Sequence, residues 1–203
     1  DGYLIHDWDG HSHGNVSMQW VLDDSLNNGA IDAMKMEGEN DFYNNLLAFG
    51  IGAPTGIDLA GEVNDPVRPQ TSWKALKYAT ASFGQGIVTT PLEMIAAINA
   101  VANGGVWVQP HVVDDVVNPN TGTTTPFVPV TRRVISAAAA HTLAKMMVGV
   151  VNDPGGEGKK ARIPGYSMEI AGKTGTAQVA LPNGRGYGNN VVASFVGFMP
   201  ATH

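Results

Sequence analysis

The most specific stretch of this sequence is Ala171-Gly172-Lys173-Thr174-Gly175-Thr176-Ala177-Gln178. It lies in a strand-like segment, 168–180, which is followed by a turn segment containing Asn183-Gly184 and by the apolar run 191–199. Two strand-like runs joined by a turn of this kind predict a β-hairpin. A continuous apolar run further predicts that the second strand is buried on both faces.

The segments before this hairpin carry mainly helix signals. Thr90-Pro91-Leu92-Glu93 predicts a helix start with a capping box, and Ser136 predicts the cap of a second long helix. Shorter helices are expected over 16–24, 29–36 and 39–49, and strand and turn structure over 106–117 and 126–130. Helices first and a hairpin last predict an α+β fold, with an antiparallel sheet flanked by helices. One hairpin is too small to be that sheet, and the sequence offers no good candidates for the two or more further strands.

Composition excludes several classes of function. The 203 residues carry a formal net charge of -6, and the densest cationic spot, Lys159-Lys160 with Arg162, is too small to bind nucleic acid. The chain has no cysteine, which removes disulfides and zinc–thiolate sites. A cluster of histidines and aspartates at 6–13 is interpreted as a solvated loop, so neither a metal nor a cofactor is expected.

Two short motifs carry residues suited to chemistry. Lys173-Thr174-Gly175-Thr176 puts an ammonium group and two hydroxyls on one strand, and Gly175 lets a ligand lie close to the backbone. Strand alternation predicts Lys173 and Gly175 on one side and the two threonines on the other, unless this is a twisted edge strand. Ser25-Leu26-Asn27 falls at a helix–helix junction, where both polar residues could simply be caps. Taken singly, each motif favours a structural interpretation over a functional one.

The two motifs together, in this order, resemble those of class B penicillin-binding proteins. The likeness extends over nearly the whole chain and includes the stretches listed here: Phe49-Gly50-Ile51-Gly52, Pro54-Thr55-Gly56-Ile57-Asp58-Leu59, Ser82-Phe83-Gly84-Gln85-Gly86, Ala102-Asn103-Gly104-Gly105, Ile163-Pro164-Gly165-Tyr166 and Ala193-Ser194-Phe195-Val196-Gly197-Phe198. The resemblance implies a β-lactamase/transpeptidase-like α+β fold that occupies residues 1–203 and is incomplete at both ends.

The resemblance also implies a reaction and a set of roles. The reaction is acyl transfer, in which a serine attacks the D-Ala-D-Ala end of a peptidoglycan stem peptide, and β-lactam antibiotics mimic that dipeptide. Ser25 would relay a proton, Asn27 would hold the substrate amide, and Lys173 would supply positive charge. The remaining expected substrate-binding residues are Thr174, Gly175, Thr176 and Gln178. The hydroxyls of the two threonines would bind the substrate carboxylate, and the backbone N–H of Thr176 would donate to the oxyanion.

One part of the family pattern is missing. No serine in the chain has a lysine three residues later, and Thr71-Ser72-Trp73-Lys74 spaces only a threonine in this way, on the wrong side of the Ser-x-Asn motif. We therefore expect the C-terminal part of a transpeptidase domain, trimmed at both ends and inactive alone. The missing N-terminal part of the domain, or a neighbouring chain, is expected to cover the exposed faces of the hairpin.

Location and alternatives follow from the same resemblance. It implies action outside the cytoplasm by a longer protein that is anchored to the membrane through an upstream segment. A non-catalytic module that binds peptidoglycan peptides with the same fold remains an alternative. A hydrolytic β-lactamase is a weaker one, because the segment 50–69 and the Ser-Phe-Gly-Gln-Gly element resemble the synthetic enzymes.

Overall fold

The computed structural model describes residues 4–181 and 186–201. Its helical elements, in chain order, are α1 (Met18–Asp23), α2 (Asn27–Glu37), α3 (Glu39–Ala48), the 3₁₀ turn η1 (Gln70–Ser72), α4 (Ala75–Ser82), α5 (Pro91–Ala102), α6 (Ala137–Asn152) and the 3₁₀ turn η2 (Glu157–Ala161). Among these described residues, no helix is both long enough and apolar enough to cross a membrane.

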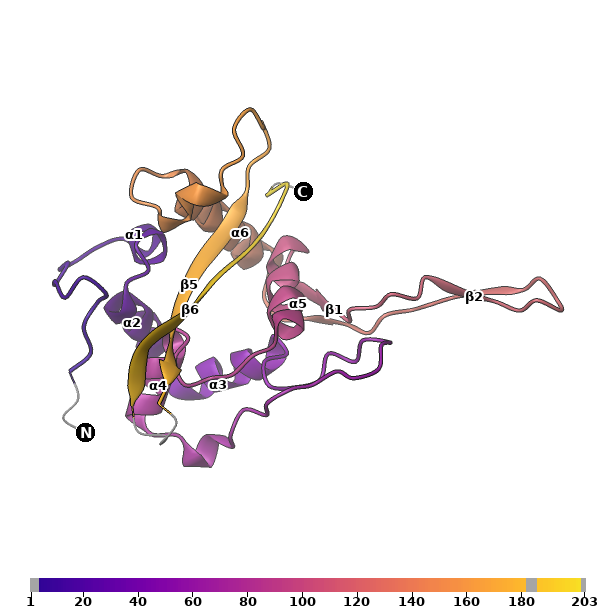
Figure 1. Ribbon diagram of the computed structural model, residues 1–203, viewed down its shortest axis with the longest axis horizontal. Helices are drawn as coiled ribbons and strands as arrows, with labels where there is room; N and C mark the ends of the chain where they lie inside the picture. Colours follow the sequence, from indigo (N-terminus) through magenta and orange to yellow (C-terminus); the bar gives the residue numbers. More distant parts are fainter. Residues whose placement is uncertain (1–3, 182–185, 202–203) are drawn as a thin grey trace.

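The strands pair in three antiparallel two-stranded sheets within the described part of the chain. The strands are β1 (Val106–Val108), β2 (Asp115–Val117), β3 (Thr124–Pro126), β4 (Thr131–Arg133), β5 (Ala171–Ala180) and β6 (Tyr187–Phe198), and the pairs are β1 with β4, β2 with β3, and β5 with β6. The β5–β6 hairpin is the long one, and it runs diagonally through the centre of the molecule (Figure 1). The β2–β3 hairpin extends from the body as a long arm (Figure 1).

The caps predicted from the sequence are present. Thr90 and Glu93 form a reciprocal capping box at the start of α5, and the Ser136 side chain accepts a hydrogen bond from the backbone N–H of Ala139 at the start of α6. Gly38 and Gly50 follow the ends of α2 and α3 with φ angles of 98° and 89°. Local side-chain chemistry therefore fixes the bounds of these helices.

Two apolar clusters hold the body together. One lies between α5, α6 and the start of β5, and joins Val101, Ala144, Met147 and Ala171. The other packs α2 against α4 and joins Ile31, Met34, Trp73, Tyr78 and Ala81. The first cluster packs the start of β5 against α5 and α6. The second builds the helical part that begins directly after Ser25-Leu26.

The structure corrects one expectation about the hairpin. The strand β6 is not buried on both faces, because Val191, Val192 and Phe195 are exposed. The reason is that β6 pairs only with β5 among the described residues, and its contacts with α5 leave these three side chains uncovered. The predicted turn at Asn183-Gly184 lies outside the described residues.

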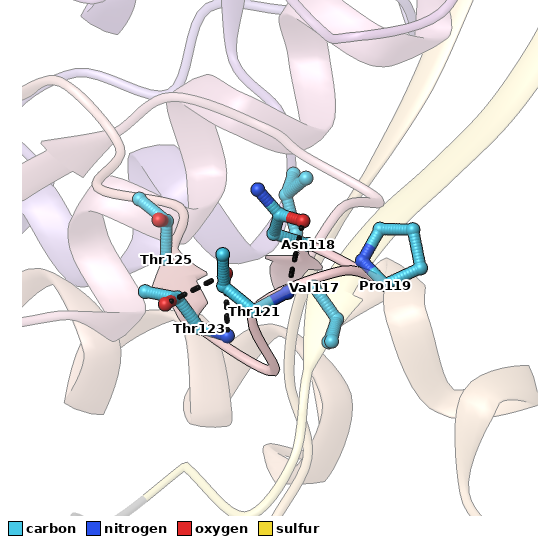
Figure 2. A pocket seen from close by; sticks show the side chains of 7 residues that line it. Val117, Asn118, Pro119, Thr121, Thr123 and Thr125 are labelled. Carbon is cyan, nitrogen blue, oxygen red and sulfur yellow. Dashed lines mark hydrogen bonds between the residues drawn. The ribbon is translucent and has the colours of Figure 1, made fainter.

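A pocket lies on the β2–β3 arm, far from the centre of the molecule (Figure 1). Figure 2 shows that its polar side chains form hydrogen bonds within the turn. Thr121 donates its backbone N–H to Asn118 Oδ1 at 3.4 Å and its hydroxyl to Thr123 Oγ1 at 3.0 Å. Because these bonds stay within the turn, the pocket is a feature of the hairpin fold and not a candidate for chemistry.

Candidate functional site

Ser25 occupies the junction between α1 and α2 in a backbone conformation that is unusual for its type. Its φ is 54°, and it is the one non-glycine residue among those described with a positive φ. The following residue, Leu26, is buried, and its backbone N–H donates to Val21 O at 3.0 Å. A left-handed conformation is costly for a residue with a Cβ, so the fold holds this serine in place at an energetic cost.

Lys173 and Ser25 meet across 148 residues of sequence. The Lys173 ammonium donates to Ser25 Oγ at 2.8 Å and reaches back to the carbonyl oxygen and the hydroxyl of Thr174, at 3.1 and 3.3 Å. Thr174 was expected on the opposite side of the strand from Lys173. The long lysine side chain folds back over its own strand, so one ammonium group joins both hydroxyls.

Burial shapes the charge of this lysine. Desolvation lowers the pKa of Lys173 below its ordinary value of 10.5, and the charges of Glu157 and Asp23 pull it part of the way back up. A lysine whose pKa is lowered in this way exchanges protons more readily near neutral pH than a solvated lysine does.

Asp23 is a buried carboxyl group close to the site that sequence reasoning missed. It is 7% exposed and accepts a hydrogen bond from Gln19 Nε2 at 2.7 Å. The same Gln19 amide donates to Met146 O on α6 at 2.9 Å, which ties α1 to α6. Burial raises the pKa of Asp23, and the charge of Asp153 raises it further. No motif around Asp23 marks it, so only the packing of α1 on α6 reveals its position.

Glu157 is the second acidic residue that the sequence did not assign to the site. The Thr174 hydroxyl donates to Glu157 Oε2 at 3.2 Å. Glu157 is the first residue of η2 and lies among the glycines of the loop 155–158. The resulting chain of contacts runs from Ser25 through Lys173 and Thr174 to Glu157.

The other predicted residues lie nearby without joining that chain of contacts. Asn27 is the first residue of α2, and its side-chain amide donates to His6 O at 2.9 Å. Thr176 and Gln178 lie further along β5 and are exposed. Gly175 pairs with Ser194 of β6, and a Cβ at position 175 would come within 2.6 Å of Ser194 Oγ. The structure thus joins Ser25, Lys173 and Thr174, and leaves Thr176 and Gln178 open to solvent on the same strand.

The predicted solvated loop at 6–13 makes contacts within itself and also with the start of α2. Asp9 accepts the backbone N–H of His11 at 2.9 Å, and His13 Nε2 lies 3.3 Å from the Asp9 carboxylate. Asp7 differs, because it is buried and accepts the backbone N–H and the side-chain amide of Asn28. In the described part of the chain, no three of these groups gather in an arrangement that could hold a metal ion.

The arrangement has a definite chemical capacity. Lys173 presents positive charge to a hydroxyl that can still donate its own proton, and exposed Thr176 offers a further hydroxyl on the same strand. Such a group can move a proton at Ser25 and can attract a ligand carboxylate.

Comparison with known proteins gives a consistent result. The family model described as the penicillin binding protein transpeptidase domain matches residues 1–203. Stage V sporulation protein D of Bacillus subtilis is 32% identical over 203 residues, which cover 99% of this chain and 31% of that protein. Peptidoglycan D,D-transpeptidase FtsI of Escherichia coli is 30% identical over 94% of this chain and 30% of its own length. The chain therefore spans about a third of the length of these relatives.

A solved structure agrees with the sequence relatives. Penicillin binding protein 3 from Mycobacterium tuberculosis, complexed with ampicillin, superimposes with a TM-score of 0.88 at 34% identity. The match covers 97% of this chain and 44% of that one. The predicted β-lactamase/transpeptidase-like fold is confirmed by this likeness.

Proposed function

Because this chain belongs to the penicillin-binding protein transpeptidase domain family, we propose that it forms one side of a D,D-transpeptidase site that takes the D-Ala-D-Ala end of peptidoglycan stem peptides. The contact between Lys173 Nζ and Ser25 Oγ, at 2.8 Å, is the observation that carries the proposal. It supports the proposal because one direct hydrogen bond joins the two motifs that the family's reaction requires together.

The proposed reaction is acyl transfer in two steps. A serine oxygen attacks the carbonyl carbon of the penultimate D-Ala, an ester forms, the amide bond breaks, and the departing D-Ala amine takes up a proton. An acceptor amine then attacks the ester carbonyl, an amide cross-link forms, the ester bond breaks, and a proton from the acceptor amine goes to the serine oxygen. Ser25 and Lys173 pass the proton in both steps, while Thr174 and Thr176 hold the terminal carboxylate. Asn27 holds the substrate amide, and Gly175 and Gln178 line its path along β5.

Asn27 and Thr174 must release their present partners to act in this way. The Asn27 amide now donates to His6 O, and the Thr174 hydroxyl donates to Glu157. Both partners lie close to the surface, so a ligand can replace each hydrogen bond with one of its own.

The attacking serine is not supplied by residues 1–203 under this proposal, since none of their serines has a lysine three positions later. We assign that serine to a segment of the full-length protein outside this sequence, and we expect the chain alone to form no covalent adduct. The nucleophile's own N–H would be the second oxyanion donor beside that of Thr176. Loss of one such donor costs about 10²–10³ in rate.

The proposal extends to β-lactam antibiotics, to the place of action and to one partner. Penicillin binding protein 3 is known complexed with ampicillin, and we propose that the full-length protein is acylated by the same class of drug. Its substrate would place it outside the cytoplasm, with an upstream membrane anchor. The exposed apolar side chains of β6 support a partner for the hairpin, either the rest of the same domain or a neighbouring chain.

Labelling of the full-length protein with fluorescent penicillin tests the proposal. Lys173→Ala is expected to slow acylation by about 10²-fold or more, as the loss of a charged group at a reacting centre does. The matched control is Lys145→Ala, because Lys145 is an exposed lysine on α6 with no part in the site. Equal labelling of the Lys173→Ala variant and the native protein would refute the proposal. Reversible binding of stem peptide with no covalent label would instead favour the non-catalytic module.

A further inference from the structure

The carboxylate of Glu157 lies where the proposed function places a ligand carboxylate. Its Oε2 atom accepts a hydrogen bond from the Thr174 hydroxyl at 3.2 Å. Burial lowers the pKa of Lys173, and the charge of Glu157 raises it again in part, so this carboxylate also lies within electrostatic reach of the ammonium group. The protein therefore holds a carboxylate of its own beside two of the groups that would bind the end of a substrate.

The backbone that carries Glu157 is fixed, but its side chain is free to turn. Gly156 is buried, and a Cβ at this position would come within 2.2 Å of Val150 O, so the loop lies directly against α6. Arg162, which follows η2, donates its Nε–H to Val151 O at 2.7 Å. The Glu157 side chain itself is exposed. Because the backbone is held on both sides, Glu157 can leave the Thr174 hydroxyl through a change of rotamer alone.

The Thr174 hydroxyl can serve only one carboxylate at a time. A threonine hydroxyl has one proton to donate, and Glu157 receives it in this structure. The Lys173 ammonium, at 3.3 Å, uses the acceptor side of the same hydroxyl. A ligand carboxylate must therefore replace Glu157 before Thr174 can donate to it.

We propose that Glu157 is a specificity-determining residue that competes with the terminal carboxylate of the ligand for the Thr174 hydroxyl, an inference that rests on the proposed function for the identity of the ligand. A free carboxylate that binds here breaks the hydrogen bond between Thr174 and Glu157 and brings two negative charges close together. A ligand with a neutral end leaves Glu157 where it is. Glu157 thus reduces the advantage of a ligand that ends in a free acid, and it keeps Thr174 hydrogen-bonded when no ligand is bound.

The test compares acylation of the full-length protein by a penicillin and by the methyl ester of the same penicillin, which carries no charge at its carboxyl group. Glu157→Gln keeps the shape of the side chain and removes its charge. Acylation by the penicillin should become about threefold faster, the effect of one exposed charge pair, while acylation by the ester should stay unchanged. Glu157→Ala, which also removes the hydrogen-bond acceptor, should gain at least as much. Glu169→Gln removes the same charge from an exposed position two residues before β5 and should change neither rate.

Two features of the design isolate the competition. The rates are compared at about pH 6, because loss of the Glu157 charge favours the neutral form of Lys173 and a pH below neutral favours the protonated form. Thr174→Val removes the hydroxyl, so the gain from Glu157→Gln should largely disappear in this background. An equal gain with and without the hydroxyl would overturn the competition. Equal gains for the penicillin and its ester would do the same.

Acetate separates this inference from the proposed function. It is titrated into the full-length protein with methyl-labelled threonine, and the Thr174 methyl signal is followed by NMR. If acetate binds the Glu157→Gln variant about threefold tighter than the native protein, while penicillin acylates neither, the competition stands and the proposed function fails. If penicillin acylates both at the same rate and acetate binds both equally, the function stands and the competition is overturned. The absence of a gain with either carboxylate overturns the competition whatever the fate of the proposed function.

Discussion

Substitution of Ser25, whose backbone is in the left-handed conformation, tests what the Lys173 hydrogen bond and the backbone conformation each contribute to stability. Ser25 has a φ of 54° and accepts a hydrogen bond from the buried Lys173 ammonium at 2.8 Å. Ser25→Ala removes the hydroxyl and keeps a Cβ in the unfavourable backbone conformation. Ser25→Gly also removes the hydroxyl but allows this conformation freely. The two variants therefore separate the contribution of the hydrogen bond from the cost of the backbone.

The magnitudes follow from the contacts. A hydrogen bond to a charged group contributes about 1.5–3 kcal/mol, and Lys173 keeps its two contacts with Thr174. We therefore expect Ser25→Ala to lower the free energy of unfolding by about 2 kcal/mol, near the lower end of that range. A left-handed residue with a Cβ costs about 1–2 kcal/mol. Ser25→Gly should thus be about 1 kcal/mol more stable than Ser25→Ala.

Urea denaturation of the 203-residue chain at pH 7 measures both differences. In a domain of this size, 1 kcal/mol corresponds to about 2–4 °C in melting temperature, so thermal unfolding provides a check. Asp32→Ala removes an exposed carboxylate that pairs with Lys35 on α2, and it serves as the surface control. It should change the free energy of unfolding little. If Ser25→Ala were as stable as the native chain, or more stable than Ser25→Gly, this account of the junction would be wrong.

Three further predictions concern charge and capping. Glu157→Gln should lower the pKa of Lys173 further, because the negative charge of Glu157 raises that pKa. Glu169→Gln, which changes an exposed residue and serves as the control, should leave the NMR titration of Lys173 unchanged. Equal titrations of Lys173 in both variants would count against the contact. The pKa of Asp23 is raised in the folded chain, so its contribution to stability is present at low pH and is lost as the pH rises through that raised pKa. Asp23→Asn should therefore gain stability relative to the native chain between pH 3 and pH 7 (about the range over which a raised carboxyl pKa acts), and a constant difference across that range would contradict the assignment. Thr90→Ala removes the cap on the Glu93 N–H and should cost about 1 kcal/mol in thermal unfolding, whereas Thr90→Ser should cost much less.

Local chemistry explains what the sequence predicted well. The capping box at Thr90 and Glu93, the serine cap at Ser136 and the glycine after α3 each act within a few residues, so their effect can be read without knowledge of the fold. The helix α4 escaped prediction because its start has no side-chain cap. It is held by burial of Tyr78 beside α2, which is a tertiary contact.

The site was predictable in part. Lys173 and Ser25 are 148 residues apart, and no periodicity joins them, so their meeting was expected only through the resemblance of the two motifs to one family. Asp23 and Glu157 belong to no motif and come into place through the packing of α1 and η2. The apolar pattern of β6 predicted burial, but burial depends on which partner covers a strand, and a pattern within the strand does not contain that information.

We propose that Ser25, Lys173 and the threonines of β5 form one binding site for a peptide carboxylate. Its most direct test is NMR titration of the 203-residue chain with a short peptide ending in D-Ala-D-Ala and with the same peptide as its C-terminal amide. We predict that the free acid shifts the signals of Ser25, Lys173 and Thr176 together, and that the amide does not. Equal shifts with both peptides, or shifts at Lys173 without any at Ser25, would contradict the claim.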